Sequence, residues 1–161
     1  MKAALAQLIR TLNARGWSPA TSTNYSCIDE QQQCWVSRSG VNKADFTEQD
    51  LICIDEKGLA IGLFQGVKPS DETQIHLWIY RNFPDAKVVL HSHGKFPVLI
   101  SQFNEHVFAV QGYELQKGFK GCGSHLDILE IPIIDNQQDM AVLCQALDER
   151  KAEIQYHCFI I

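Results

Sequence analysis

The chain has 161 residues, of which 45% are hydrophobic and 20% are charged, a balance typical of one globular domain. Its formal net charge of −5 argues against a nucleic-acid-binding protein, which would carry a basic surface. No apolar run approaches the roughly 20 residues that span a membrane, and the N-terminus has the pattern of an amphipathic helix rather than an export signal. We therefore expect a cytoplasmic protein whose six cysteines are reduced.

The first part of the chain predicts a helix followed by a hairpin. Apolar side chains recur at helical spacing from Leu5 to Leu12, and Gly16 suits the C-terminal cap. Residues 21–27 and 34–37 have the composition of two antiparallel strands with a polar loop between them.

Short elements are expected next. Residues 47–50 have the pattern of a capping box for one helical turn, and strands are predicted at 51–54 and 59–64. A helix then begins with Ser70 or Asp71 as its N-cap.

The second half of the chain continues to mix strands with helices. We predict a strand at 87–91, a helix at 96–103, a strand at 107–110, a helical turn at 113–118, a strand at 129–134, a helix starting between Asn136 and Asp139, and a strand at 154–161. This order favours a mixed, mostly antiparallel sheet covered by helices. We expect one domain over residues 1–161, and because the chain stops inside an apolar strand pattern, we expect the C-terminal part of that domain to be missing.

A His-Ser-His sequence ends the strand predicted at 87–91. Alternate side chains of a strand share a face, so His91 and His93 would lie roughly 6–7 Å apart. Two imidazoles at that spacing can bind one divalent cation. A catalytic metal site usually has a third protein ligand, and the spacing of the other histidines does not single one out; His76 is interpreted as a surface or packing residue.

Three other stretches carry candidate chemistry. Residues 37–40 and 69–72 offer hydroxyls and backbone N–H groups that suit a phosphate, although on physical grounds alone a turn and a helix cap are the better explanation of both. Glu114 would be an ordinary solvated carboxylate by itself, but beside a metal it becomes a candidate acid/base.

These stretches, taken together, resemble the class II aldolase/adducin-like family. The similarity extends through nearly the whole chain, in residues 16–26, 36–52, 68–81, 89–93, 110–118 and 131–140. Within the family, they look most like the branch that acts in methionine salvage. The resemblance implies an α/β fold, a three-layer sandwich with a mixed, mostly antiparallel central sheet flanked by helices. It also implies a homotetramer with active sites at subunit interfaces.

The resemblance further implies a site. His91 and His93 would bind one Zn²⁺ per subunit, and Glu114 falls on the catalytic acid/base position. Glu72 falls where the sugar-phosphate aldolases of the family keep their catalytic acid. The phosphate loops of the family match Asn24, Ser39, Gly40, Ser70 and Asp71. The third zinc histidine of the family would follow the last residue of this chain, and His157 does not match it.

The implied activity is a zinc-dependent dehydration. The substrate would be the small sugar phosphate 5-methylthioribulose 1-phosphate, and the product 2,3-diketo-5-methylthiopentyl 1-phosphate. One alternative is a class II aldolase or epimerase that acts on another sugar phosphate. A further alternative is a truncated, inactive interaction module with the same fold.

Overall fold

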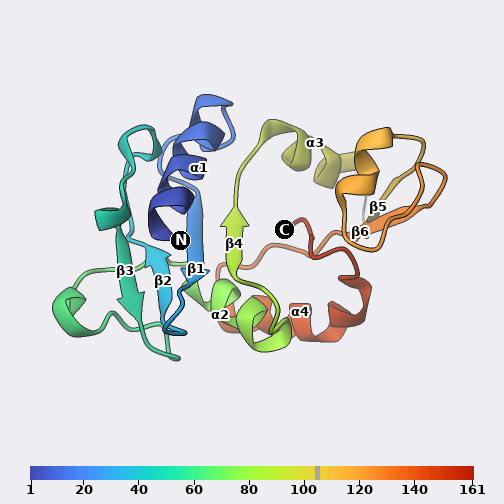
Figure 1. The fold of residues 1–161 in the computed structure, drawn as a ribbon. Helices are drawn as coiled ribbons and strands as arrows, with labels where there is room; N and C mark the ends of the chain where they lie inside the picture. Colours follow the sequence, from blue (N-terminus) through green and yellow to red (C-terminus); the bar gives the residue numbers. More distant parts are fainter. Residues whose placement is uncertain (104–105) are drawn as a thin grey trace. The chain divides into compact units, whose positions relative to one another are not determined.

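A computed structural model of the chain describes residues 1–103 and 106–161 (Figure 1). The chain divides into two compact units, Met1–Gly94 and Lys95–Ile161. The first unit contains a four-stranded sheet and the second a two-stranded sheet. That both units belong to one family domain remains a prediction.

The sheet of the first unit is antiparallel throughout, in the order β3-β2-β1-β4 (Figure 1). Its strands are β1 (Asn24–Ile28), β2 (Cys34–Ser37), β3 (Leu51–Ile54) and β4 (Val88–His91). The predicted hairpin is confirmed, although its first strand begins at Asn24 instead of residue 21. The antiparallel arrangement agrees with the fold class that the sequence predicts.

Two helices cover opposite faces of this sheet: α1 (Lys2–Ala14) and α2 (Thr73–Asn82). Successive side chains of a strand point to opposite faces, so Tyr25 and Cys27 share one face of β1 while Ser26 lies on the other. The α1 face is apolar and includes Leu5, Ala6, Ile9, Leu12, Tyr25, Cys27, Phe46 and Leu51. The core on the α2 face includes Val36, Ile52, Ile54 and Leu77. The first unit is therefore a three-layer helix–sheet–helix sandwich.

Gly16 closes α1 as the sequence predicts. Its φ of 74° is a left-handed conformation that glycine adopts without steric cost. The amides of Gly16 and Trp17 donate to the carbonyls of Asn13 and Leu12, at 2.9 and 3.1 Å. This pair of hydrogen bonds is a Schellman motif, which satisfies the last carbonyls of the helix.

Two short helical turns precede β3, namely η1 (Lys43–Asp45) and η2 (Glu48–Asp50). The capping box predicted at residues 47–50 is confirmed, since Thr47 and Asp50 satisfy one another's backbone and side-chain groups.

The strand predicted at residues 59–64 is wrong. Only Ala60 forms a bridge, to Ile54, and the chain then enters the helical turn η3 (Gly62–Phe64). Gly62 has a φ of 61°, which an extended strand does not allow, and Leu63 is fully exposed. The apolar pattern of this segment therefore does not mark a buried strand.

The predicted cap of α2 needs a correction as well. Neither Ser70 nor Asp71 is the N-cap; the helix begins at Thr73 and Glu72 precedes it. The Ser70 carbonyl accepts hydrogen bonds from the amide and hydroxyl of Thr73, so backbone turns carry the chain into the helix. The Glu72 side chain makes no capping hydrogen bond and is free to interact elsewhere.

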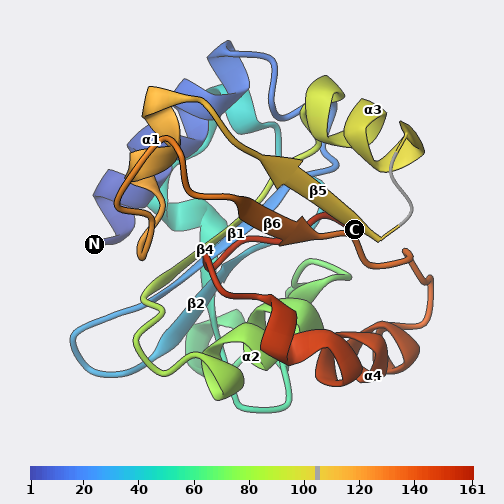
Figure 2. The same cartoon turned by 90° about the vertical axis from the view of Figure 1, so that its right-hand side faces the viewer.

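In its described residues, the second unit has two α-helices, two helical turns and one antiparallel pair of strands. Its elements are α3 (Lys95–Phe103), β5 (Val107–Val110), η4 (Glu114–Gly118), β6 (Leu129–Pro132), α4 (Met140–Arg150) and η5 (Lys151–Glu153). Figure 2 shows β5 beside β6, and the two pair antiparallel. The predicted helix is present as α4, and Asp139 caps it by accepting a hydrogen bond from the Ala141 amide. Among the described helices, none has the length and apolar character needed to cross a membrane.

The strand predicted at residues 154–161 is also wrong. Within the described residues this segment forms a single bridge, between Ile160 and Ile133. His157 has a φ of 55°, so the backbone turns in the middle of the segment and cannot continue as a strand. The predicted strand from residue 129 correspondingly ends at Pro132, two residues early.

The α1 layer should account for much of the stability of the first unit. Ile9 is fully buried and Leu8, one residue earlier, is 38% exposed. We expect Ile9→Ala to lower the free energy of unfolding by about 2–5 kcal/mol, because it leaves a cavity under the helix. The matched variant Leu8→Ala should cost less than about 1 kcal/mol. Urea denaturation of both variants checks this, and equal losses would contradict the proposed packing.

Candidate metal centre

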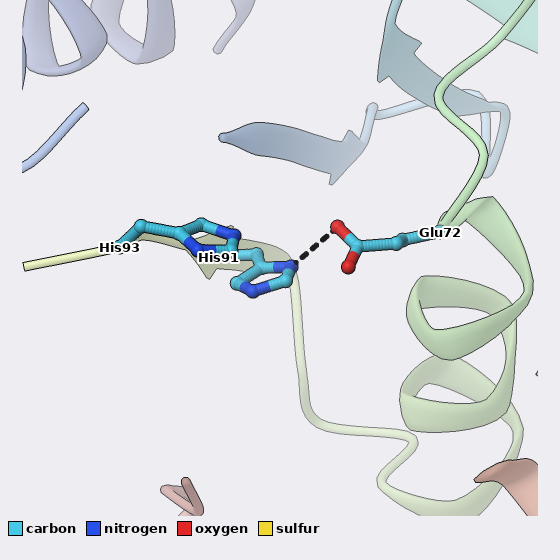
Figure 3. A group of neighbouring side chains, drawn as sticks. All are labelled: Glu72, His91 and His93. Atoms are coloured by element: carbon cyan, nitrogen blue, oxygen red, sulfur yellow. Dashed lines mark ion pairs between the residues drawn. The ribbon is translucent and has the colours of Figure 1, made fainter. Parts of the chain in front are cut away.

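Three potential metal ligands meet where β4 ends and α2 begins (Figure 3). His91 is the last residue of β4, His93 follows shortly after it, and Glu72 directly precedes α2. One ligand atom from each of the three lies within 4.8 Å of the others. The two predicted histidines are therefore together, and the structure adds a carboxylate to them.

The Glu72 carboxylate accepts a hydrogen bond from one nitrogen of His91. Oε2 of Glu72 lies 2.8 Å from Nδ1 of His91, and both side chains are largely buried (Figure 3). A carboxylate accepts, so Nδ1 carries the proton and donates it. A neutral His91 then keeps a lone pair on Nε2. This is the arrangement in which metal-binding histidines commonly occur, with the second ring nitrogen bonded to a carboxylate.

His93 supplies an unpaired nitrogen beside His91. The two rings stack with their centroids 4.7 Å apart and their planes at 25°. Nε2 of His93 is buried and has no hydrogen-bond partner among the described residues. A buried polar atom without a partner costs about 1–3 kcal/mol. A cation would provide the missing partner, and imidazole nitrogens are common ligands of catalytic zinc.

The charge states of these residues suit a metal. Burial raises the pKa of Glu72, but the hydrogen bond and charge of His91, together with the hydrogen bond from Asn24, outweigh this and lower the pKa below its ordinary value. Burial, and then the neighbouring charge of His91, lower the pKa of His93. A carboxylate anion and a neutral imidazole are the protonation states that metal ligands need.

A line of polar side chains continues from Glu72 along the α2 face of β1. Asn24 Nδ2 donates to Glu72 Oε2, and Asn24 Oδ1 lies 2.5 Å from His76 Nε2. His76 Nδ1 lies 2.6 Å from Ser26 Oγ, which is 2.8 Å from the Tyr80 hydroxyl. These contacts place a hydrogen-bonded polar layer next to the candidate metal centre.

His76 is the residue of this layer whose role the sequence does not reveal. It is buried, with 1% of its surface exposed, so it packs inside the unit and is not a surface residue. Burial first, and then the neighbouring charge of His91, lower the pKa of His76 to about 3, while Glu72 opposes this shift. His76 is therefore neutral at neutral pH. The sequence does hold one indication that His76 lies near Glu72: the two residues are four positions apart at the start of a helix, which places them on the same side of it.

The two predicted phosphate loops lie side by side. The amide of Ser39 donates to the Lys68 carbonyl at 3.0 Å, and the amide of Ser70 donates to the Ser37 carbonyl at 3.3 Å. The backbones of Arg38 and Pro69 also form an isolated antiparallel β-bridge. The candidate residues Ser39, Gly40, Ser70 and Asp71 thus belong to one paired loop region.

This loop region leaves the sheet at the same edge as the metal centre. Ser26 of β1 pairs with Val36, and Asn24 of β1 pairs with His91. The strands are antiparallel, so the C-terminal ends of β2 and β4 both lie beside the N-terminal end of β1. Asn24 is at this edge too, but its side chain is buried and both of its polar atoms are already bonded.

Glu114 lies in the second unit, at the start of η4. Its carboxylate is 2.7 Å from Lys117 Nζ and 3.2 Å from His125 Nδ1, and its side chain is 70% exposed. The predicted helical turn is therefore present, and the carboxylate is accessible to a ligand.

Comparison with known proteins identifies the family. Residues 3–160 match the class II aldolase and adducin N-terminal domain. The chain belongs to this family. Membership accounts for an α/β fold with a mostly antiparallel sheet and helices.

Several members of the family from bacteria are similar to the chain in sequence. It is 44% identical to a methylthioribulose-1-phosphate dehydratase of Picosynechococcus sp., over 99% of this chain and 76% of that protein. Dehydratases of the same name from Klebsiella pneumoniae and Xanthomonas oryzae are 41% and 38% identical, over 86% and 87% of this chain. The chain spans 70% and 62% of the lengths of these two relatives.

Solved structures of the family share the fold. One is YgbL of Klebsiella pneumoniae, described as a candidate aldolase, epimerase or decarboxylase. It aligns with a TM-score of 0.77 and 20% identity, over 99% of this chain and 72% of that chain. The L-fuculose-1-phosphate aldolase of Thermus thermophilus aligns with a TM-score of 0.65 and 23% identity, over 90% of this chain and 69% of that chain.

Buried, neutral His76 should make stability depend on pH. Its pKa is about 3 in the folded chain, against an ordinary value of 6.5. Between these values the unfolded chain binds a proton that the folded chain does not, so stability falls as pH is lowered from 6.5. The slope from this residue is at most about 1.4 kcal/mol per pH unit. We expect denaturation of His76→Gln at pH 4–7 to give a shallower slope than the wild type, and an unchanged slope would contradict the assignment.

Proposed function

We propose that this protein is a hydro-lyase that converts 5-methylthioribulose 1-phosphate to 2,3-diketo-5-methylthiopentyl 1-phosphate, a step of methionine salvage. The observation that carries the proposal is the 44% identity, over 99% of this chain, to a methylthioribulose-1-phosphate dehydratase. The cluster of Glu72, His91 and His93 gives that similarity a chemical basis, because it provides metal ligands in a class II aldolase fold.

The proposed cofactor is one Zn²⁺ per subunit. His91, through Nε2, and His93 would bind it, while Glu72 accepts a hydrogen bond from Nδ1 of His91 and so orients that ligand. When bound, zinc supplies a Lewis acid that polarises a carbonyl oxygen such as that at C2 of the substrate.

The remaining roles follow from the family resemblance and from accessible groups. Glu114 would act as acid/base: its carboxylate would take the C3 proton and the resulting carboxylic acid would return a proton to the C4 hydroxyl, which leaves as water, and the enol formed rearranges to the 2,3-diketone. The backbone and hydroxyl donors of the paired loop region, together with Gly40 and Asp71, would position the phosphate group. Asn24 and Glu72 complete the proposed substrate side of the site. The loop region leaves the sheet at the edge where the metal ligands lie, so one substrate can reach both.

We further propose a cytoplasmic homotetramer. The family resemblance supports the tetramer, and exposed apolar side chains such as Leu63 in the first unit and Leu115 in the second are available to form subunit contacts.

A second candidate is an aldolase or epimerase of another sugar phosphate, which the structural likeness to L-fuculose-1-phosphate aldolase favours. Substrate depletion assays with methylthioribulose 1-phosphate, fuculose 1-phosphate and ribulose phosphates separate the two. The dehydratase should consume the first and release water without carbon–carbon cleavage. Turnover of fuculose 1-phosphate alone would favour the aldolase, and no turnover with no bound metal would favour an interaction module.

The metal assignment predicts a specific loss of zinc. Purified wild-type protein should contain about one zinc per chain by plasma mass spectrometry, and His91→Ala and His93→Ala should each lose most of it, because a single remaining imidazole holds the cation poorly. His106→Ala is the matched control, since His106 is exposed and lies outside the cluster. Full zinc content in all three variants would place the metal elsewhere.

The assignment of Glu114 predicts a loss of turnover with the metal retained. Glu114→Gln keeps the size of the side chain but removes the transferable proton, so kcat should fall by roughly 10²–10⁴-fold while zinc content stays at the wild-type level. Glu130→Gln on β6, also an exposed acid, serves as the control and should keep full kcat. Steady-state kinetics with methylthioribulose 1-phosphate measure both; equal kcat values would remove Glu114 from the mechanism.

A further inference from the structure

The polar layer next to the candidate metal centre is continuous. It runs from Tyr80 through Ser26 and His76 to Asn24, and it ends on the Glu72 carboxylate. Ser26, Asn24 and His76 are buried, with at most 3% of their surfaces exposed. Buried polar groups in such a network are costly unless every member is satisfied, so the direction of each hydrogen bond is constrained by its neighbours.

Those directions can be assigned from the Glu72 end. Asn24 donates from Nδ2 to the carboxylate, so its Oδ1 is an acceptor. His76 Nε2, 2.5 Å from that oxygen, must therefore be the donor. A neutral imidazole carries one proton, which leaves Nδ1 of His76 to accept from a hydroxyl.

The directions of the remaining hydrogen bonds, from His76 to Tyr80, follow in the same way. Ser26 Oγ, 2.6 Å from His76 Nδ1, uses its only proton in that bond. It then accepts from the Tyr80 hydroxyl at 2.8 Å. Every hydrogen bond of this network is thus donated in the direction of Glu72.

This hydrogen-bonded network determines which nitrogen of His91 carries the proton. Glu72 Oε2 receives one hydrogen bond from Asn24 and another from His91 Nδ1. If His76 carried its proton on Nδ1, its Nε2 lone pair would face Asn24 Oδ1, and the amide would have to turn over. Asn24 would then present an oxygen to the carboxylate, and the two acceptors would repel each other.

We propose that His76 is a positioning residue: through Asn24 it holds the Glu72 carboxylate against His91 Nδ1, and so leaves His91 Nε2 free to bind the metal. The inference rests on the metal site proposed above, and it gives Asn24 a role in orienting Glu72 besides any contact with substrate. The hydroxyls of Ser26 and Tyr80 set the orientation of the His76 ring.

The first test is made on metal-free, full-length protein without substrate. Long-range ¹H–¹⁵N NMR of the histidine rings distinguishes the two neutral tautomers. We expect His76 to be protonated on Nε2 and His91 on Nδ1, with His76→Gln and His91→Ala used to assign the signals. A His76 ring protonated on Nδ1 would overturn the proposal, whether or not the protein proves to be a dehydratase.

The second test separates positioning from packing. His76→Leu fills most of the volume but can neither donate nor accept, whereas His76→Gln can donate to Asn24 from its amide. We expect His76→Leu to weaken Co²⁺ binding, followed by its visible absorption, by roughly 10–100-fold, the usual loss when an outer partner of a metal ligand is removed. His76→Gln should recover most of that affinity, and thermal melting reports whether each variant is folded.

Each outcome of the second test has a meaning. Wild-type affinity in folded His76→Leu, or equal losses in the leucine and glutamine variants, would show that His76 only fills space. If His76→Leu does not fold, Tyr80→Phe removes the outermost donor and should alter the His76 ring signals. Unaltered signals in Tyr80→Phe would overturn the assigned direction. If the wild type binds no Co²⁺, the metal site of the proposed function fails, while the tautomers still decide this inference.

Discussion

The antiparallel pairing of β1 with β4, which sets Asn24 opposite His91, is the constraint on which the candidate metal centre depends. A shift of this register by one residue would turn His91 to the other face of the sheet, away from Glu72. With the observed register, the end of one strand and the start of one helix bring an imidazole and a carboxylate within hydrogen-bonding distance. The strand end also carries His93, so two of the three potential ligands come from one short segment.

The two faces of the same sheet have separate physical tasks. Tyr25 and Cys27 point into the apolar layer under α1, where burial of nonpolar surface stabilises the unit. Their neighbours Asn24 and Ser26 point into the polar layer beside α2. Alternation along a single strand therefore separates the stabilising contacts from the chemical ones. The polar layer is tolerated because its members satisfy one another's hydrogen bonds.

The ends of the strands place binding groups along one edge of the first unit. The loop at residues 37–40 follows β2, which ends beside the start of β1 at Asn24. The loop at residues 68–71 pairs with it through backbone hydrogen bonds. The hydroxyl groups of these loops suit an anion, whereas the histidines suit a cation. A substrate with a phosphate at one end and a carbonyl near it has groups for both, which is the chemical form of the substrate in the proposed reaction.

Local sequence determined the features that need only a few neighbouring residues. The helix with Gly16 at its end, the capping box at residues 47–50, the strand at 51–54 and the His-Ser-His pair are all present as predicted. The strand patterns at 59–64 and 154–161 misled, because a strand needs a partner and negative φ angles, and neither is visible in a short apolar run.

Tertiary structure alone decided what Glu72 and His76 do. His76 looks unremarkable on a predicted helix, and only the family resemblance singles out Glu72. Their partners Asn24 and His91 come from strands that are distant along the chain; His76 and Asn24, for example, are separated by 52 positions. Spacing along a sequence determines which side chains share a face, but not which face of another element will lie opposite them. The register of β1 with β4 supplies that information, and with it the carboxylate that joins the two histidines.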